Sequence, residues 1–316
     1  MINKKTYKTT FSQLFIKMDN NLASESSRKD WYDRYYKILF LIPIVLLIIS
    51  LAYLGYFFNK HGDFMLKDVS LSGGTSITLQ GDINIRNLES QLKSKFPDLS
   101  VRSLTDITTG KPVSFILESS STPEQLKPEI EKALGYKLTD KNSSTEFTGP
   151  SLSNSFYKQL LFALLISFIL MSITIFIIFR TFIPSIAVIF AVFGDIVMPL
   201  ALIDFLGIRL SAAGIAAFLM LVGYSVDTDI LLTTRAIRTK GSSLNSRIFR
   251  AFKTGSFMTL TALVAILPAF FIVSGLPDSF RQIFFILALG LFADLINTWL
   301  TNASIIKWYC ERKKIQ

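Results

Sequence analysis

Six long apolar segments dominate the pattern of hydrophobic and polar positions along the chain. They cover residues 38–58, 158–179, 184–206, 211–234, 256–274 and 282–305. Each is long enough to cross a hydrocarbon core of about 30 Å, which takes about 20 helical residues. The pattern therefore predicts a multi-pass protein of the lipid bilayer with six transmembrane helices.

Residues 59–157, between the first two apolar segments, have a different pattern. Apolar and polar positions alternate in "GTSITL" and "PVSFILE", which predicts half-buried strands, and "LSVRSLTDI" and residues 144–149 are further candidate strands. In two stretches between these strands, apolar residues recur at helical spacing. The side chains expected to face a core are Ile77, Leu79, Ile85, Leu88, Leu92, Phe96, Val113, Phe115, Leu117, Leu126, Ile130 and Leu134. The order β-α-β-β-α-β predicts a ferredoxin-like α+β domain.

The second helix of this domain has its own start and stop signals. Thr122 stands at the N-cap, Pro123 at the first helical position and Gln125 at the third, which predicts a capping box. Gly135 is expected to end the helix.

The distribution of Lys and Arg along the chain predicts how the protein is oriented in the membrane. The chain is 50% hydrophobic with a net charge of +10, and eight Lys and Arg lie in residues 1–37, six in 235–255 and four in 307–316. Basic residues of membrane proteins gather on cytoplasmic segments, so this charge does not indicate nucleic-acid binding. We expect a cytoplasmic N-terminal segment (1–37), a first helix (38–58), an extracytoplasmic domain (59–157), helices two to six (158–306) with a basic cytoplasmic loop (235–255), and a cytoplasmic tail (307–316). The membrane is expected to be the cell membrane (plasma or inner).

Four aspartates lie inside the apolar segments: Asp195 in the third, Asp227 and Asp229 in the fourth, and Asp294 in the sixth. One ionised Asp at a helix centre costs about 2.5–3.5 kcal/mol on insertion scales, so such residues are functional candidates. With neighbouring hydroxyls they predict a proton or cation relay. A buried polar network that only fastens helices together is the alternative.

The two aspartates of the fourth segment point about 200° apart on a regular helix. Ser225, Asp229 and Thr233 share one face, and Tyr224, Asp227 and Thr234 share the other. Both faces are then expected to be shielded from lipid, which predicts that this helix is central in its bundle. Small residues in its first half, at positions 211–217, agree with close helix contact.

The stretch "GYSVDTDILLTTR", from Gly223 and Tyr224 to Arg235, resembles the fourth-helix motif of the SecF family of protein-export subunits. "LSGGTSITL", with Gly73 and Gly74, resembles the strand that opens the SecF outer domain. "TEFTGPSLS", with Gly149 and Pro150, resembles the segment that leads into its second helix. Both dipeptides also have a structural interpretation, as a strand bulge and a turn.

The resemblance implies a partner, a channel and a driving force. A SecD-like subunit would complete a twelve-helix bundle of the RND type, and the pair would assist a SecYEG-type channel by using the proton-motive force to draw out the translocating polypeptide. In the bacterial form of the motif, the functional Asp falls on Thr228 of this chain. Here Asp227 and Asp229 flank that position, as in the archaeal branch. The resemblance therefore leaves open which of the two carries the ion. Arg250 matches a family arginine that could pair with a carboxylate; contact with anionic lipid is its alternative role.

Other classes fit less well. A homodimeric RND-like transporter of small molecules or lipids would have the same helices and a different cargo, and a structural assembly factor would use the acids as interhelical contacts. An intramembrane aspartyl protease needs two acids in sequence contexts that this chain lacks. No nucleotide, metal or nucleophile motif occurs, and the single Cys310 permits no cysteine cluster. We therefore expect no enzyme activity and no cofactor.

Overall fold

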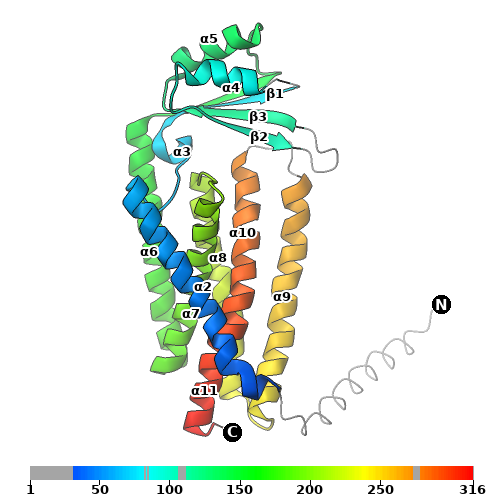
Figure 1. The fold of residues 1–316 in the computed structure, drawn as a ribbon. Coiled ribbons are helices and arrows are strands. Elements are labelled where there is room, and N and C mark those ends of the chain that lie inside the picture. The colour runs from blue at the N-terminus through cyan, green and yellow to red at the C-terminus, as the bar shows by residue number, and fades with distance from the viewer. Residues whose placement is uncertain (1–30, 82, 84, 106–111, 273–277, 316) are drawn as a thin grey trace, which may run out of the picture.

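Six of the described helices are long and apolar enough to cross a membrane, which confirms that prediction. The computed structural model describes residues 31–315 apart from 82, 84, 106–111 and 273–277. Residues 1–30 of the basic N-terminal segment therefore lie outside the described residues. The spans are α2 (Trp31–His61), α6 (Pro150–Phe179), α7 (Phe182–Phe205), α8 (Ala212–Arg238), α9 (Leu244–Ile272) and the continuous run of α10 (Asp278–Ile296), η3 (Asn297–Asn302) and α11 (Ala303–Lys313) (Figure 1).

Two of these helices begin well before their apolar segments. α6 begins at Pro150, with Gly149 as its N-cap, and α9 begins at Leu244, so only residues 239–243 connect α8 to α9. The expected loop 235–255 is therefore mostly helical. A hydropathy window finds only the part of a helix that matches the hydrocarbon core, whereas the backbone hydrogen bonds continue through polar turns outside it.

α8 occupies the centre of the bundle, as predicted. It packs against α6, α7, α9 and α10. Close approach depends on small residues at the contacts: a Cβ on Gly214 would lie 2.7 Å from Oε1 of Gln282, and a Cβ on Gly290 of α10 would collide with the Leu221 side chain. The helix with the candidate motif is thus held between four neighbours.

Residues 66–148 form the predicted ferredoxin-like domain at one end of the bundle (Figure 1). Its elements are the short α3 (Val69–Ser72), β1 (Gly74–Gln80), α4 (Ile85–Lys93), β2 (Ser100–Thr105), β3 (Pro112–Ser119), α5 (Pro123–Leu134) and β4 (Ser143–Thr148). The strand order is β2-β3-β1-β4, and every neighbouring pair is antiparallel. The helices α4 and α5 cover one face of this sheet.

The core of this domain is the one that the sequence pattern predicts. The buried side chains include Ile77, Leu79, Leu88, Leu92, Phe115, Leu117, Leu126 and Ile130. Ile85, Phe96 and Leu134 are partly buried against them. The side chain of Val113 lies outside the described residues. Gly135 ends α5 with φ 76°, as expected, but the capping box is wrong: Thr122 is the N-cap and its hydroxyl makes no capping hydrogen bond.

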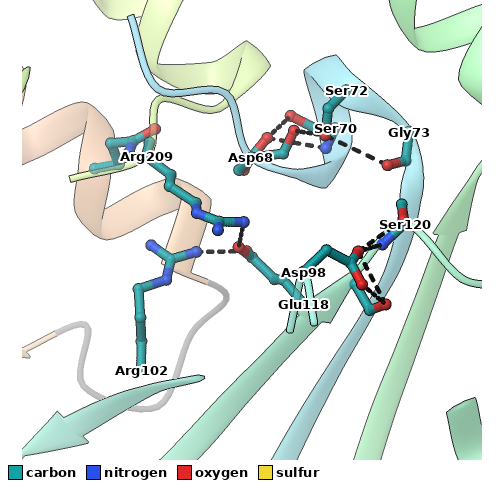
Figure 2. Close-up of polar contacts among 11 residues, drawn as sticks. Asp68, Ser70, Ser72, Gly73, Asp98, Arg102, Glu118, Ser120 and Arg209 are labelled. Carbon is teal, nitrogen blue, oxygen red and sulfur yellow. Dashed lines mark hydrogen bonds and ion pairs between the residues drawn. The ribbon is translucent and has the colours of Figure 1, made fainter. Parts of the chain in front are cut away.

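Ion pairs around one buried carboxylate join the sheet domain to the membrane helices (Figure 2). Glu118 of β3 is 3% exposed, and one of its carboxylate oxygens pairs with Arg102 of β2. Its Oε2 lies 3.6 Å from Nη1 of Arg209, which belongs to the connection between α7 and α8. A buried carboxylate of the sheet is thereby compensated in part by a charge from the helical bundle.

Backbone hydrogen bonds make the same junction. Leu210 N donates to the carbonyl of Leu66 (2.6 Å), and Asp68 N donates to the carbonyl of Leu210 (3.0 Å). The hydroxyl of Ser70 accepts from Ala212 N, the first residue of α8 (2.9 Å). The segment that enters β1 is therefore tied directly to the start of α8.

Asp68, at this junction, is expected to make the stability of the protein depend on pH. Its Oδ1 caps α3 by accepting from Ser70 N (2.9 Å). Burial raises the pKa of Asp68 to about 6, and the nearby Glu118 carboxylate acts in the same direction. A pKa raised by folding means that the contribution of Asp68 to stability is present at about pH 4 and lost as the pH rises through about 6. Asp68→Asn, which cannot ionise, is expected to raise the melting temperature at pH 7 and to lose that advantage near pH 4.

The measurement is thermal unfolding of the full-length protein in detergent between pH 4 and pH 7. The expected gain at pH 7 is on the order of 2–3 kcal/mol. Asp140→Asn, the same change at an exposed position, is the control and should leave the melting temperature unaltered at either pH. An equal gain at both ends of the pH range would contradict the explanation.

Candidate functional site

Three of the predicted intramembrane acids converge inside the bundle. Asp195 of α7, Asp229 of α8 and Asp294 of α10 are each fully buried, with 0% of the residue exposed. Among the described residues, no Lys or Arg forms an ion pair with any of them. Their polar partners are hydroxyl and amide side chains, so nothing on this network holds a compensating positive charge.

Asp195 is held from two sides. The Ser225 hydroxyl of α8 donates to its Oδ2, and the amide Nδ2 of Asn297 in η3 donates to its Oδ1 at 2.7 Å. Gly194, next to it in the chain, allows this approach, because a Cβ there would lie 2.7 Å from Asn297 Nδ2. Asp195 therefore links three spans.

Asp294 gathers three hydroxyls. Thr228 of α8 and Thr298 of η3 each lie 2.9 Å from its Oδ1, and Thr259 of α9 lies 3.4 Å from its Oδ2. The hydroxyl of Thr228 is also 2.9 Å from the carbonyl of Ser225, so its single proton can serve only one of these acceptors at a time.

Asp229 is only partly satisfied. Its Oδ1 accepts from Asn302 Nδ2 at 2.7 Å. Its Oδ2 has no hydrogen-bond partner among the described residues, and neither do Asn302 Oδ1 and the hydroxyl of Thr233, although all three atoms are buried. Buried polar atoms are nearly always paired, so a group of unpaired oxygens next to a carboxylate has the chemistry to accept a proton or a small cation.

The other face of α8 is exposed in this chain. Tyr224 is 51% exposed, and Gly223 and Asp227 are exposed too. Asp227 makes no hydrogen bond or ion pair within the described part of the chain. None of the described helices covers the face with Asp227, so the shielding of this face from lipid stays a prediction.

The two predicted arginines do not reach the acids. Arg250 of α9 donates through Nε to the Ser246 carbonyl at 3.4 Å in its own helix and forms no ion pair with these acids in the described residues, so its pairing with a carboxylate stays a prediction. Arg235 donates to the Arg250 carbonyl and to the Thr254 hydroxyl, both at 3.0 Å. These contacts join α8 to α9 near the basic connection.

The two glycine motifs meet in space. β1 pairs with β4 so that Gly74 lies opposite Thr148, and a Cβ on Gly73 would be 2.5 Å from the Cα of Pro150. Gly149 and Pro150 begin α6 instead of forming a separate turn. These residues therefore shape the passage from the sheet into the second span, away from the acids.

Four residues of the network were missed by the sequence analysis: Thr259, Asn297, Thr298 and Asn302. The signal was present in "NTWLTN", a run of polar side chains inside an apolar span, one of which follows Asp294 by four residues. Residues four apart share a helix face, so this spacing would have placed Thr298 beside Asp294.

The fold and the network together define a polytopic α-helical membrane protein with ionisable groups enclosed by its spans. Residues 130–312 match the family model for the C-terminal part of the protein-export membrane proteins SecD and SecF. The SecF of Methanolacinia petrolearia is 34% identical over 281 residues, which cover 87% of this chain and 94% of that protein. The SecF of Methanocaldococcus jannaschii is 34% identical over 278 residues, with 87% and 95% covered. The chain belongs to the SecF family of protein-export membrane proteins.

Solved structures share the fold. The crystal structure of SecDF, a translocon-associated membrane protein from Thermus thermophilus, superposes with a TM-score of 0.70 at 16% identity. That match covers 91% of this chain and 39% of the SecDF chain. SecDF in its super-membrane-facing form gives a TM-score of 0.55 at 21% identity. This chain thus spans about two fifths of the length of those proteins.

Proposed function

We propose that this protein is an accessory subunit of Sec-dependent export, and that ion movement through Asp195, Asp229 and Asp294 drives it. The observation that carries the proposal is the convergence of three fully buried acids from three helices on hydroxyl and amide partners alone. If all three were ionised, the cost would be roughly 8–10 kcal/mol on insertion scales, so uptake of protons or cations must offset it. The role is not enzymatic.

A purely adhesive network is the main competing explanation, and one observation argues against it. Interhelical hydrogen bonds between neutral side chains stabilise membrane proteins without any acid. Here Asp229 Oδ2, Asn302 Oδ1 and the Thr233 hydroxyl remain buried without partners in the described structure. A network selected only to join helices would pair these atoms, whereas a site that loads and releases an ion needs them.

A SecD-like subunit is the proposed partner. The polar, exposed face of α8 with Tyr224 and Asp227 supports it, because a bare carboxylate in contact with lipid is costly and a second bundle would cover it. The shared fold with SecDF, whose chain is much longer, supports the same arrangement. The SecYEG-type channel and the translocating polypeptide complete the proposed assembly.

The proposed orientation has both termini in the cytoplasm. The Tyr36 hydroxyl near the start of α2 donates to Glu311 of α11 (3.1 Å), and Arg247 of α9 donates to the carbonyls of Thr239 and Ile315. These basic segments therefore gather at one end of the bundle, and the sheet domain lies at the other (Figure 1). By the bias of Lys and Arg, the basic end is cytoplasmic and the sheet domain, residues 59–157, is extracytoplasmic.

The test is export of a reporter protein into membrane vesicles with and without an ion gradient. We expect the gradient to speed export with the wild type, and this stimulation to be lost in the double variant Asp227→Asn, Asp229→Asn while insertion and partner binding persist. Asp140→Asn, at an exposed site of the sheet domain, is the matched control. Full stimulation in the double variant would overturn the relay.

Affinity purification separates the proposed function from the homodimeric transporter. The tagged protein, extracted in mild detergent from its native membrane, is expected to bring with it a SecD-like chain in about equal amount. Recovery of two copies of this chain without such a partner would instead favour the homodimer, an arrangement that the family assignment does not suggest.

A further inference from the structure

The sixth span changes its winding beside the acids. Between α10 and α11, residues Asn297–Asn302 form a π-helical turn, in which backbone hydrogen bonds run from residue i to i+5. Five of its six residues are buried: Asn297, Thr298, Trp299, Thr301 and Asn302. A π-turn is less stable than α-helix and occurs mostly at functional sites, so its position here needs an explanation.

The π-turn brings two amides to the same side of the helix. In an α-helix, residues five apart point about 140° away from each other. Hydrogen bonds from i to i+5 place such residues nearly above one another instead. Asn297 and Asn302 are five apart, and each donates at 2.7 Å, the first to Asp195 Oδ1 and the second to Asp229 Oδ1.

The two acids also share a side. Asp195 accepts from Ser225, which lies one helical turn from Asp229 on α8. Regular α-helix could direct one asparagine at this face of α7 and α8, and the other would then turn away from its acid. The winding of the sixth span and the positions of the acids are therefore matched.

We propose that Asn297 and Asn302, held in register by the π-turn, are positioning residues of the ion relay. Asn302 fixes Oδ1 of Asp229 and so directs Oδ2, which has no partner among the described residues, toward the incoming ion. Asn297 likewise fixes Oδ1 of Asp195, and the Ser225 hydroxyl donates to Oδ2 of that acid. This inference rests on the proposed function and adds to it the element that orients the acids.

The test compares Asn302→Leu with Asp229→Asn in the complete complex in vesicles. Leucine has a similar size and no amide. We expect Asn302→Leu to lower gradient-driven export about fivefold or more, with assembly and gradient-independent export unchanged within about twofold. Thr301→Val, a change of similar shape in the same π-turn, is the matched control and should leave both rates unaltered.

Infrared difference spectroscopy gives a second measurement, which would not change if Asn302 only packed against its neighbours. The carboxyl C=O band of Asp229 is the band absent from Asp229→Asn. Loss of the amide donor is expected to shift that band to higher frequency in Asn302→Leu and to leave it in place in Thr301→Val. Asn302→Ala, which withdraws the donor and adds no bulk, gives the same comparison if the leucine variant does not fold.

Deletion of Leu300 tests the winding itself, because removal of one residue from a π-turn restores an α-helical register. The two asparagines would then stand four residues apart and share one face of a regular α-helix, so we expect this variant to assemble and to keep gradient-driven export, unlike Asn302→Leu. If Asp229→Asn keeps its gradient-driven export, the relay is wrong. If Asp229→Asn loses it while Asn302→Leu keeps it, or if the band does not shift, only the positioning role is wrong.

Discussion

Asp229→Asn is expected to lower gradient-driven export by about tenfold or more, a loss of at least about 1.4 kcal/mol in the driving step. Asp227→Asn, two residues away on the same helix, is expected to change it by less than about twofold. The reason is position. Asp229 is fully buried among the acids and amides of the network, whereas Asp227 lies on the exposed face without a hydrogen bond or ion pair in the described residues.

The asparagine variant is informative because it changes little else. Asn has the shape of Asp, and its carbonyl oxygen can still accept from Asn302 Nδ2, the bond that Asp229 Oδ1 makes at 2.7 Å. What disappears is the group that can bind and release a proton at Oδ2. A loss of function therefore reports on ion loading and not on a collapsed contact between α8 and η3.

Reporter export into vesicles, with the gradient imposed or dissipated, measures the effect. The amount of each variant in the membrane and its recovery with the SecD-like partner are the controls for folding and assembly. The reverse result, with Asp227→Asn inactive and Asp229→Asn active, would show that the ion passes along the exposed face of α8 and not through the buried network.

Much of the fold follows from periodicity alone. Spans and strands are defined by which side chains leave water, and Ile77, Leu79 and the apolar segments report that directly. The first residues of α6 and α9 cannot be predicted in this way. A polar segment near Pro150 or Leu244 can belong to the helix or to the loop before it, and contacts with neighbouring segments decide which.

The site was predictable only in part. Helical phase separated Asp229 from Asp227, but it cannot say which face its neighbours cover, and that choice decides which acid joins the network. The partner of Arg250 could not be predicted for a similar reason, since a match of spacing to a family pattern fixes no side-chain direction. The π-turn was beyond reach, because one extra residue in a turn has no hydropathy signature and depends on the contacts that Asn297 and Asn302 gain.

The largest structural effect is expected at Gly74, the first residue of β1. Its φ is 131°, a region that side-chain-bearing residues rarely adopt, and a Cβ there would collide with the carbonyl oxygen of Ser119 in β3. That oxygen belongs to the backbone of the central strand pair, Thr75 opposite Ser119, so it cannot move aside without opening the ladder. Gly74→Ala should therefore combine backbone strain of about 1–3 kcal/mol with an overpacking cost of similar size.

Gly81 allows the two costs to be separated. It follows β1 directly and has φ 121°, but a Cβ there would have nothing within 4 Å. Gly81→Ala should therefore show the strain alone, and Gly74→Ala should exceed it by about 1–3 kcal/mol. Hydrogen exchange of the Ile77 and Leu117 amides in the full-length protein measures both, because these residues are paired in β1 and β3. Equal effects of the two substitutions would mean that the sheet accommodates a Cβ at Gly74, and that the glycine is needed there only for its backbone angle.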